Sequence, residues 1–216
     1  MMNILSSRNS LINHFIAEIR DVEVQKDSLR FRGNLERLGE LFAYEISKEL
    51  EYETREVVTS LGIAIVPVLK SYPVLATILR AGLPFHQGFL NMFDKSENAF
   101  VSAYRKYHKD HSFNIRIEYA SVPDIEGKTL IICDTMIATG TSVVLTYKEL
   151  LSHGKPKHTY IVSILSSQEG LDYLSRNLPR KNISVWIGTV DDELTAQAFI
   201  VPGLGDAGDL AFGKKI

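Results

Sequence analysis

The 216-residue sequence has little of several features that would place it in a special environment: one cysteine, one tryptophan and a formal net charge of −2. A single cysteine, Cys133, cannot form an internal disulfide, so we expect a buried thiol in a reducing compartment. No run reaches about 18 apolar residues, and residues 1–15 lack the apolar run of a secretion signal. The sequence therefore predicts a cytoplasmic protein with no membrane partner.

The balance of charges excludes a further kind of partner. Proteins that coat nucleic acids neutralise many phosphates with Lys and Arg. Here 24 basic residues stand against 26 acidic ones, which leaves no broad basic surface. We therefore expect no nucleic-acid partner, whereas small anions remain compatible with this composition.

Short apolar segments alternate with segments of helical length along most of the chain. Apolar runs bounded by turn residues are typical of strands, and they lie at residues 62–69, 73–79, 98–104, 129–133, 159–165, 183–188 and 198–201. Apolar residues at helical spacing or helical length mark residues 34–50, 142–154 and 167–178. The alternation predicts an α/β fold with a mainly parallel twisted sheet and helices on both faces. We find no repeat or linker, so we expect one domain over residues 1–216.

The stretch LIICDTMIATGTSVVL, Leu130–Leu145, combines features of a ligand site. Asp134 follows an apolar strand, and parallel sheets bind ligands beyond the carboxyl ends of their strands. Small residues and hydroxyls from Thr135 to Ser142 then precede a helix, whose N-terminal N–H groups favour an anion. An acid for sugar hydroxyls beside a phosphate cradle suggests a sugar phosphate. The same residues also fit a turn without a ligand, in which Thr141 or Ser142 caps the helix.

Two segments carry a resemblance to a known family. CDTMIATGTS, residues 133–142, resembles the phosphoribosyl-pyrophosphate loop of phosphoribosyltransferases, and its Met-x-Ala-Thr-Gly core is similar to that of the uracil phosphoribosyltransferase family. IVPGLGDAGDLAFG, residues 200–213, is similar to that family's uracil-binding segment. Residues 29–45, 78–85 and 103–108 also match in the family's order, so the resemblance covers most of the chain.

The resemblance implies a type I-like phosphoribosyltransferase fold with a C-terminal base-binding segment. It places an N-terminal arm and helix at about residues 1–55, a core at about 56–190 and the base-binding segment at about 191–216. The implied reaction transfers the phosphoribosyl group of phosphoribosyl pyrophosphate to uracil, giving UMP and pyrophosphate in pyrimidine salvage. Magnesium is implied as an ion carried by the pyrophosphate substrate, with no metal site built by the protein.

The resemblance also implies roles for individual residues. Arg80 and Arg105 would bind the pyrophosphate and act with Asp206 as catalytic residues, and Asp134 would bind the ribose hydroxyls. The residues expected around the 5′-phosphate are Thr135, Met136, Ile137, Ala138, Thr139, Gly140, Thr141 and Ser142. Those expected at uracil are Ile200, Gly205, Asp206 and Ala207. Asp206 would also contact phosphoribosyl pyrophosphate, and its carboxylate would either assist loss of the uracil N1 proton or contact the ribose. The Asp209 carboxylate is expected to bind the backbone of its own glycine-rich loop.

Three residues depart from the family pattern, and alternatives stay open. Thr135 stands where proline is usual, Thr141 where glycine is usual, and Leu210 where a basic residue is usual. Glycine in place of Thr141 would adopt a positive φ cheaply. One alternative is a phosphoribosyltransferase for orotate or a purine. Another is a non-catalytic uracil or nucleotide sensor on the same fold, including an RNA-binding regulator, and a third is a generic phosphate-binding domain.

The resemblance implies two further partners. One is a second copy of the chain, as a homo-oligomer of two or four subunits, for which an apolar surface beside residues 74–79 could serve. The other is guanosine triphosphate, an effector in part of the family.

Overall fold

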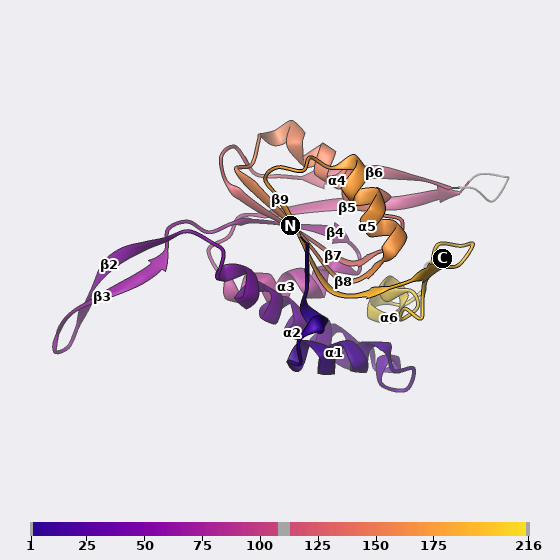
Figure 1. Cartoon of the computed structure of the whole chain (residues 1–216), viewed down its shortest axis with the longest axis horizontal. Coiled ribbons are helices and arrows are strands. Elements are labelled where there is room, and N and C mark those ends of the chain that lie inside the picture. The colour runs from indigo at the N-terminus through magenta and orange to yellow at the C-terminus, as the bar shows by residue number, and fades with distance from the viewer. Residues whose placement is uncertain (1, 108–112, 215–216) are drawn as a thin grey trace.

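A seven-stranded sheet forms the centre of the molecule in the computed structural model, which describes residues 2–107 and 113–214 but not the side chains of residues 104–107 and 113–116 (Figure 1). In chain order, the strands of the sheet are β1 (Met2–Ile4), β4 (Val74–Leu79), β5 (Asn98–Tyr107), β6 (Phe113–Ser121), β7 (Thr129–Ile137), β8 (His158–Ser167) and β9 (Ile183–Asp191). In the sheet they lie in the order β1-β9-β8-β7-β4-β5-β6. Neighbours run parallel except β5 and β6, which are antiparallel.

Helices cover both faces of this sheet (Figure 1). One face is covered by α1 (Leu11–Arg20), α2 (Ser28–Ser47) and α3 (Gly82–Met92), and the other by α4 (Thr141–Leu150) and α5 (Gln168–Asn177). Successive strand residues point to opposite faces, so Leu75 packs with the first group and Val74 with the second. The predicted α/β fold with a mainly parallel sheet is therefore confirmed.

Shorter elements connect these layers. The 3-10 helices are Leu5–Ser7, Val24–Lys26 and Leu151–His153, and the short helix α6 (Ala207–Phe212) lies against α2. The apolar run at 198–201 contributes only the two residues of β11 (Ile200–Val201), which pairs with β10 (Glu193–Leu194) in a separate sheet. None of the helices in the described part of the chain is long and apolar enough to cross a bilayer. Cys133 lies buried in β7 as a free thiol.

The apolar run at residues 62–69 does not belong to the central sheet. It forms β3 (Gly62–Leu69), which pairs with β2 (Tyr52–Thr59) in an antiparallel hairpin that extends away from the rest of the molecule (Figure 1). The expectation of an apolar surface beside residues 74–79 is wrong, because β4 lies between β5 and β7 and its residues are almost all buried. The hairpin carries seven exposed large apolar side chains: Tyr52, Val57, Val58, Leu61, Ile63, Ile65 and Val66.

Candidate active site

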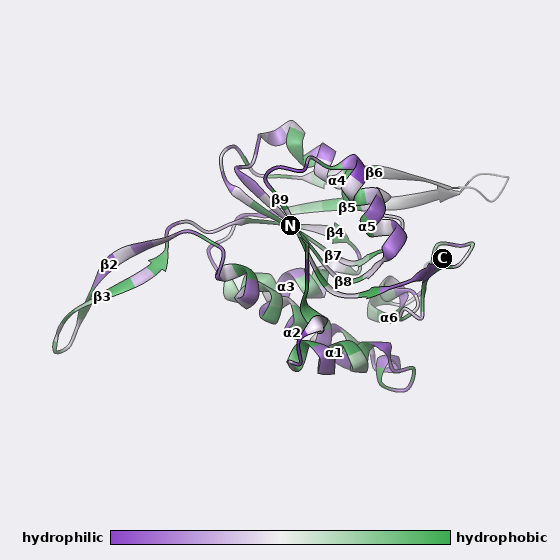
Figure 2. Ribbon diagram, in the orientation of Figure 1, coloured by the Kyte–Doolittle hydropathy of each residue, from purple (hydrophilic) through white to green (hydrophobic). Residues whose placement is uncertain are grey.

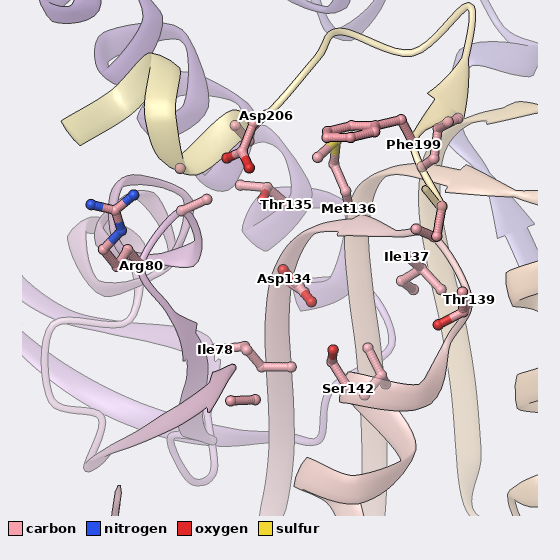
Figure 3. Close-up of a pocket in the computed structure, with 18 of the residues that line it drawn as sticks. Ile78, Arg80, Asp134, Thr135, Met136, Ile137, Thr139, Ser142, Phe199 and Asp206 are labelled. Carbon is pink, nitrogen blue, oxygen red and sulfur yellow. The ribbon is translucent and has the colours of Figure 1, made fainter. Parts of the chain in front are cut away.

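A pocket of about 490 Å³ opens over the carboxyl ends of β4 and β7, where a parallel sheet is expected to bind a ligand (Figure 3). The sequence-predicted residues that line it are Arg80, Asp134, Thr135, Met136, Ile137, Ala138, Thr139, Gly140, Ser142, Ile200, Asp206 and Ala207. The structure thus brings the end of β4, the loop after β7 and the C-terminal segment to one cavity. Thr141 and Gly205 flank the cavity but do not line it, and the side chain of Arg105, in β5, lies outside the described residues.

The loop between β7 and α4 leaves the start of the helix open to a ligand. Gly140 precedes α4 with a φ of 76°, and no side chain caps the helix within the described residues. The alternative in which Thr141 or Ser142 merely caps α4 is therefore wrong. The positive φ falls on Gly140, whereas Thr141 is already helical, so threonine is accommodated where the family usually has glycine. The N–H of Thr141 contacts Thr139 Oγ1 at 3.5 Å. The start of α4, with Gly140 and Ser142, lines the pocket, and a helix N-terminus favours an anion there.

Two serines at the end of β8 hold this loop in place, and the sequence analysis missed both. Ser166 Oγ donates to the carbonyl oxygen of Ile137 at 3.2 Å, and Ser167 Oγ donates to that of Ala138 at 2.5 Å. Ser167 Oγ also accepts from the N–H of Gly170 and so caps α5. A pair of serines between a buried strand and a helix was the available signal, but nothing in the sequence indicated that their partner would be the loop after the neighbouring strand.

Asp134 lies within β7, three residues before the strand ends at Ile137, and directs its carboxylate into the pocket (Figure 3). The strand thus runs past Cys133, where the sequence predicted its end. Burial raises the pKa of this carboxyl from 3.8 to about 7, and the N–H groups of Met136 and Thr135 oppose the rise only in part. Desolvation disfavours a charged carboxylate, whereas hydroxyl groups that donate to it favour the charged form. Asp134 is therefore suited to a ligand that brings several hydroxyl donors, as a ribose does.

Arg80 lies at the opposite wall, beside the start of α6 (Figure 3). Its Nη2 donates to Asp209 Oδ1 at 3.2 Å and to the carbonyl oxygen of Gly213 at 3.3 Å, and its buried Nε has no partner among the described residues. A Cβ on Gly208 would lie 3.4 Å from Nη2, so glycine gives the guanidinium room. Because Arg80 lines the pocket, its guanidinium is placed to bind an anionic group there.

The expectation for Asp209 is wrong. Its carboxylate pairs with Arg80 instead of the local backbone. Asp206 plays the part expected of Asp209: its Oδ1 accepts from the N–H of Asp209 at 3.0 Å and caps α6. Proximity of α6 to the end of β4 explains the exchange of partners, and this tertiary contact has no local sequence signal.

Apolar residues complete the pocket, and the sequence analysis did not single them out. Ile78 precedes Arg80 in β4, and Phe199 precedes Ile200 at the mouth, on the same side as Met136 (Figure 3). Phe199 and Met136 lie next to each other and give the cavity an apolar wall that suits a planar base (Figure 3). Ile78 lies on the other side of Asp134, near Ser142.

The pocket offers oxygen ligands of the kind that magnesium prefers. The carboxylates of Asp134 and Asp206 both line it, and hard cations bind carboxylate oxygen. Among the described residues, no group of three or more His, Cys, Asp or Glu side chains is placed to hold a metal ion. The donor set therefore fits magnesium that arrives on a substrate and takes one or two protein carboxylates.

The fold and this cavity define a class of protein that binds a sugar phosphate over the carboxyl ends of a parallel sheet. The family model for uracil phosphoribosyltransferase matches residues 6–214 of the chain. The sequence is 55% identical over 212 residues to the uracil phosphoribosyltransferase of Porphyromonas gingivalis, with 98% of both chains covered. It is 35% identical over 208 residues to that of Pyrococcus furiosus, with 95% of this chain and 87% of the relative covered.

A solved structure agrees with the computed fold. The AQ2163 protein from Aquifex aeolicus superimposes with a TM-score of 0.87 at 29% identity, covering 99% of this chain and 98% of its own. The chain belongs to the uracil phosphoribosyltransferase family. The resemblance of residues 133–142 and 200–213 to that family is therefore confirmed.

Proposed function

We propose that the chain transfers the phosphoribosyl group from phosphoribosyl pyrophosphate to uracil, forming UMP and pyrophosphate in pyrimidine salvage. The observation that carries the proposal is a single pocket lined both by residues of the stretch Asp134–Ser142 and by Ile200, Asp206 and Ala207 of the C-terminal segment. The first of these supplies a helix N-terminus and a carboxylate for a ribose phosphate. The second supplies backbone groups for a small planar base, so both substrates of the reaction fit one cavity.

The proposed chemistry asks mainly for positioning and for neutralisation of charge. The anomeric carbon of ribose gains positive character as the pyrophosphate departs. Arg80, which lines the pocket, would bind the leaving group with its guanidinium, and Arg105 would add a second cation from β5. Asp134 would hold the ribose hydroxyls, fixing the sugar for attack by uracil N1. Magnesium bound with the pyrophosphate, next to Asp134 and Asp206, would neutralise further charge.

Base recognition would rest on main-chain atoms. Ile200 and Ala207 line the pocket from the two ends of the base segment, with Gly205 between them. Their N–H and C=O groups can match the acceptor, donor, acceptor edge of uracil. The Asp206 carboxylate is held by the N–H of Asp209 at 3.0 Å through Oδ1 and keeps Oδ2 available. Asp206 can therefore accept a hydrogen bond from uracil N1–H or from the ribose while its Oδ1 continues to cap α6.

The test is to incubate the protein with labelled uracil, phosphoribosyl pyrophosphate and magnesium, and to measure UMP and pyrophosphate. The proposal expects the two products in equal amounts. Absence of UMP above the protein-free control contradicts it. Binding of uracil without turnover would favour the sensor alternative, and product from orotate or hypoxanthine but not from uracil would favour a different base. Guanosine triphosphate added to the same assay tests whether it acts as an effector.

We also propose that a second copy of the chain covers the hairpin of β2 and β3, giving a homo-oligomer of two or four subunits. Four apolar side chains on the hairpin, Val58, Leu61, Ile63 and Ile65, are between 65% and 98% exposed. The hydropathy colouring shows apolar residues along β3, away from the main body (Figure 2). A lone two-stranded hairpin is marginal in water, and a contiguous exposed apolar patch marks an interaction surface.

Light scattering tests this assembly. The parent is expected as a dimer or tetramer, and a double variant, Leu61→Asp with Ile63→Asp, is expected as a smaller species with the same secondary structure. Val22→Asp is the matched control, because Val22 is also exposed but lies in the turn after α1. A monomeric parent, or a double variant of unchanged mass, contradicts the proposal. The cytoplasmic setting expected from the sequence stays a prediction.

A further inference from the structure

A buried ion pair lies at the carboxyl end of β9, outside the lining of the pocket. Arg20, the last residue of α1, and Asp191, the last residue of β9, meet in a two-pronged contact. Nη1 donates to Oδ2 at 2.8 Å, and Nη2 donates to Oδ1 at 2.7 Å. The side chain of Asp191 is only 6% exposed and that of Arg20 only 22%. Such a planar, bidentate pair fixes direction as well as distance.

The same two side chains hold both backbone groups of one residue in the base segment. Gly203 donates its N–H to Asp191 Oδ2 at 2.9 Å, and its carbonyl oxygen accepts from Arg20 Nη1 at 3.1 Å. Gly203 has a φ of 57°, a conformation that glycine adopts readily. The three residues therefore form a closed set of four charge-assisted hydrogen bonds, which we call the Arg20–Asp191–Gly203 brace.

The brace lies between the two ends of the segment that is proposed to read the base. Ile200 comes three residues before Gly203, and Asp206 comes three residues after it. Ile200 is fixed on one side, because β11 pairs with β10 at Leu194. The buried side chain of Leu204 anchors the chain just after Gly203. Fixing Gly203 to the end of β9 therefore sets the spacing between Ile200 and Ala207, which line opposite parts of the base end.

Stability alone does not account for this arrangement. Burying two charges costs desolvation free energy that offsets most of their attraction. Apolar residues of similar size therefore often stabilise a fold as much as a buried ion pair does, and a better attested role of such a pair is to fix a geometry. Here the charges contact main-chain atoms of the base segment and neither side chain lines the pocket. Loss of this contact is therefore expected to displace the residues that bind the base, and to leave the phosphate loop in place.

We propose that Arg20 and Asp191 are positioning residues for the base half of the site: they hold the turn at Gly203 so that the backbone of residues 200–207 reads uracil. This inference rests on the proposed transfer to uracil. It differs from that proposal in assigning a function to two residues that touch neither substrate. Its consequence is a separation of effects, with the base affected and phosphoribosyl pyrophosphate spared.

The test uses Arg20→Lys and Asp191→Asn in the full chain, with Arg30→Lys as the control. Arg30 also makes a two-pronged contact with a carboxylate, that of Glu18, but on the exposed side of α1. Each brace variant is expected to raise the KM for uracil by about tenfold and to weaken the preference for uracil over cytosine, because a charge-assisted hydrogen bond to the turn is lost. The KM for phosphoribosyl pyrophosphate should change less than about twofold. Arg30→Lys should leave both constants unchanged.

A second readout does not depend on turnover. Hydrogen exchange of the amides between residues 198 and 206 should be faster in both brace variants than in the parent and in Arg30→Lys, while the amides of the loop Asp134–Ser142 keep the parent rate. If the parent forms no UMP, the proposed function fails, and exchange still decides whether the brace holds the turn. Equal rises in both KM values, unchanged uracil kinetics or unchanged exchange would each overturn the inference.

Discussion

The two halves of the pocket are built in different ways. The phosphate half is a continuous stretch, Asp134–Ser142, whose form follows from its own residues: a buried strand, a glycine with positive φ and a helix start. The base half is an irregular segment whose backbone is held by side chains from far along the chain. Arg20, Arg32 and Arg80 donate to carbonyl oxygens of Gly203, Ala211 and Gly213 respectively. The first half therefore has a strong local signal and adds two serine contacts from β8, whereas the backbone of the second half is held by arginines from distant parts of the chain.

The largest expected effect concerns the local half. Gly140→Ala should lower kcat/KM for phosphoribosyl pyrophosphate by about a hundredfold or more, because φ is 76° there and an added Cβ would lie 2.8 Å from the carbonyl oxygen of Gly170. Steady-state kinetics at saturating uracil measures it. Gly33→Ala is the control, since a Cβ at Gly33 in α2 meets nothing within 4 Å. Parent-like kinetics for Gly140→Ala would mean that the loop does not depend on its own backbone.

The choice of base tests the other half. Cytosine replaces the O4 acceptor of uracil with a donor and the N3 donor with an acceptor, so at least two main-chain pairs would be mismatched. Each buried group left unpaired costs about 1 to 3 kcal/mol, which predicts a preference for uracil of at least about a hundredfold in kcat/KM. Comparable rates with the two bases would contradict reading by a fixed backbone.

The next largest loss of activity is expected for Asp134→Asn. It should weaken use of phosphoribosyl pyrophosphate by at least about tenfold, because an amide accepts sugar hydroxyls less strongly than a carboxylate. In the parent, kcat/KM for this substrate should rise with pH and level off above the Asp134 pKa of about 7, because only the ionised form accepts fully. The variant should lose this rise. A rise of the same size in the variant would assign the titration to another group.

The same carboxyl makes a prediction for stability. Its folded pKa of about 7 lies above the ordinary 3.8, so ionising Asp134 costs folding free energy that the protonated form does not cost. Asp134→Asn should therefore raise the Tm above pH 7, and the gain should fade as the pH falls through 7 towards 3.8. Thermal melts across this range measure it. A Tm difference that does not depend on pH would contradict the assigned burial of charge.

The smallest effect is expected for Asp209, whose carboxylate pairs with Arg80 across the pocket wall. The ion pair of Arg80 with Asp209 is about one-third exposed on both sides, and exposed pairs contribute about 0 to 1 kcal/mol. Asp209→Asn should therefore change kcat/KM by less than about fivefold. Arg80→Ala, measured beside it, should lose much more and should weaken inhibition by pyrophosphate. Equal losses in the two variants would give Asp209 a direct part in catalysis.

The same contrast explains how far the sequence could predict the site. Five strands of the central sheet (β4, β5, β7, β8 and β9), the helices α2, α4 and α5, Asp134 and the phosphate loop followed from apolar runs and turn residues, because local patterns encode them. The sequence analysis did not predict β1, β6, α1 or α3. Residues that act across the fold carried no such signal: Ser167 holds Ala138 from β8, and Asp191 holds Gly203 from β9. The exposed hairpin of β2 and β3 was also missed, since an apolar run such as residues 62–69 has the same appearance in a buried strand and in a surface that another chain could cover.

The most direct test of the account is a crystal structure with UMP bound. The 5′-phosphate should lie at the start of α4 beside Thr139 and Gly140, the ribose hydroxyls should donate to Asp134, and the uracil edge should face the main chain between Ile200 and Ala207. A nucleotide bound with its base at the phosphate loop, or with its base away from the C-terminal segment, would contradict the assignment of the two halves.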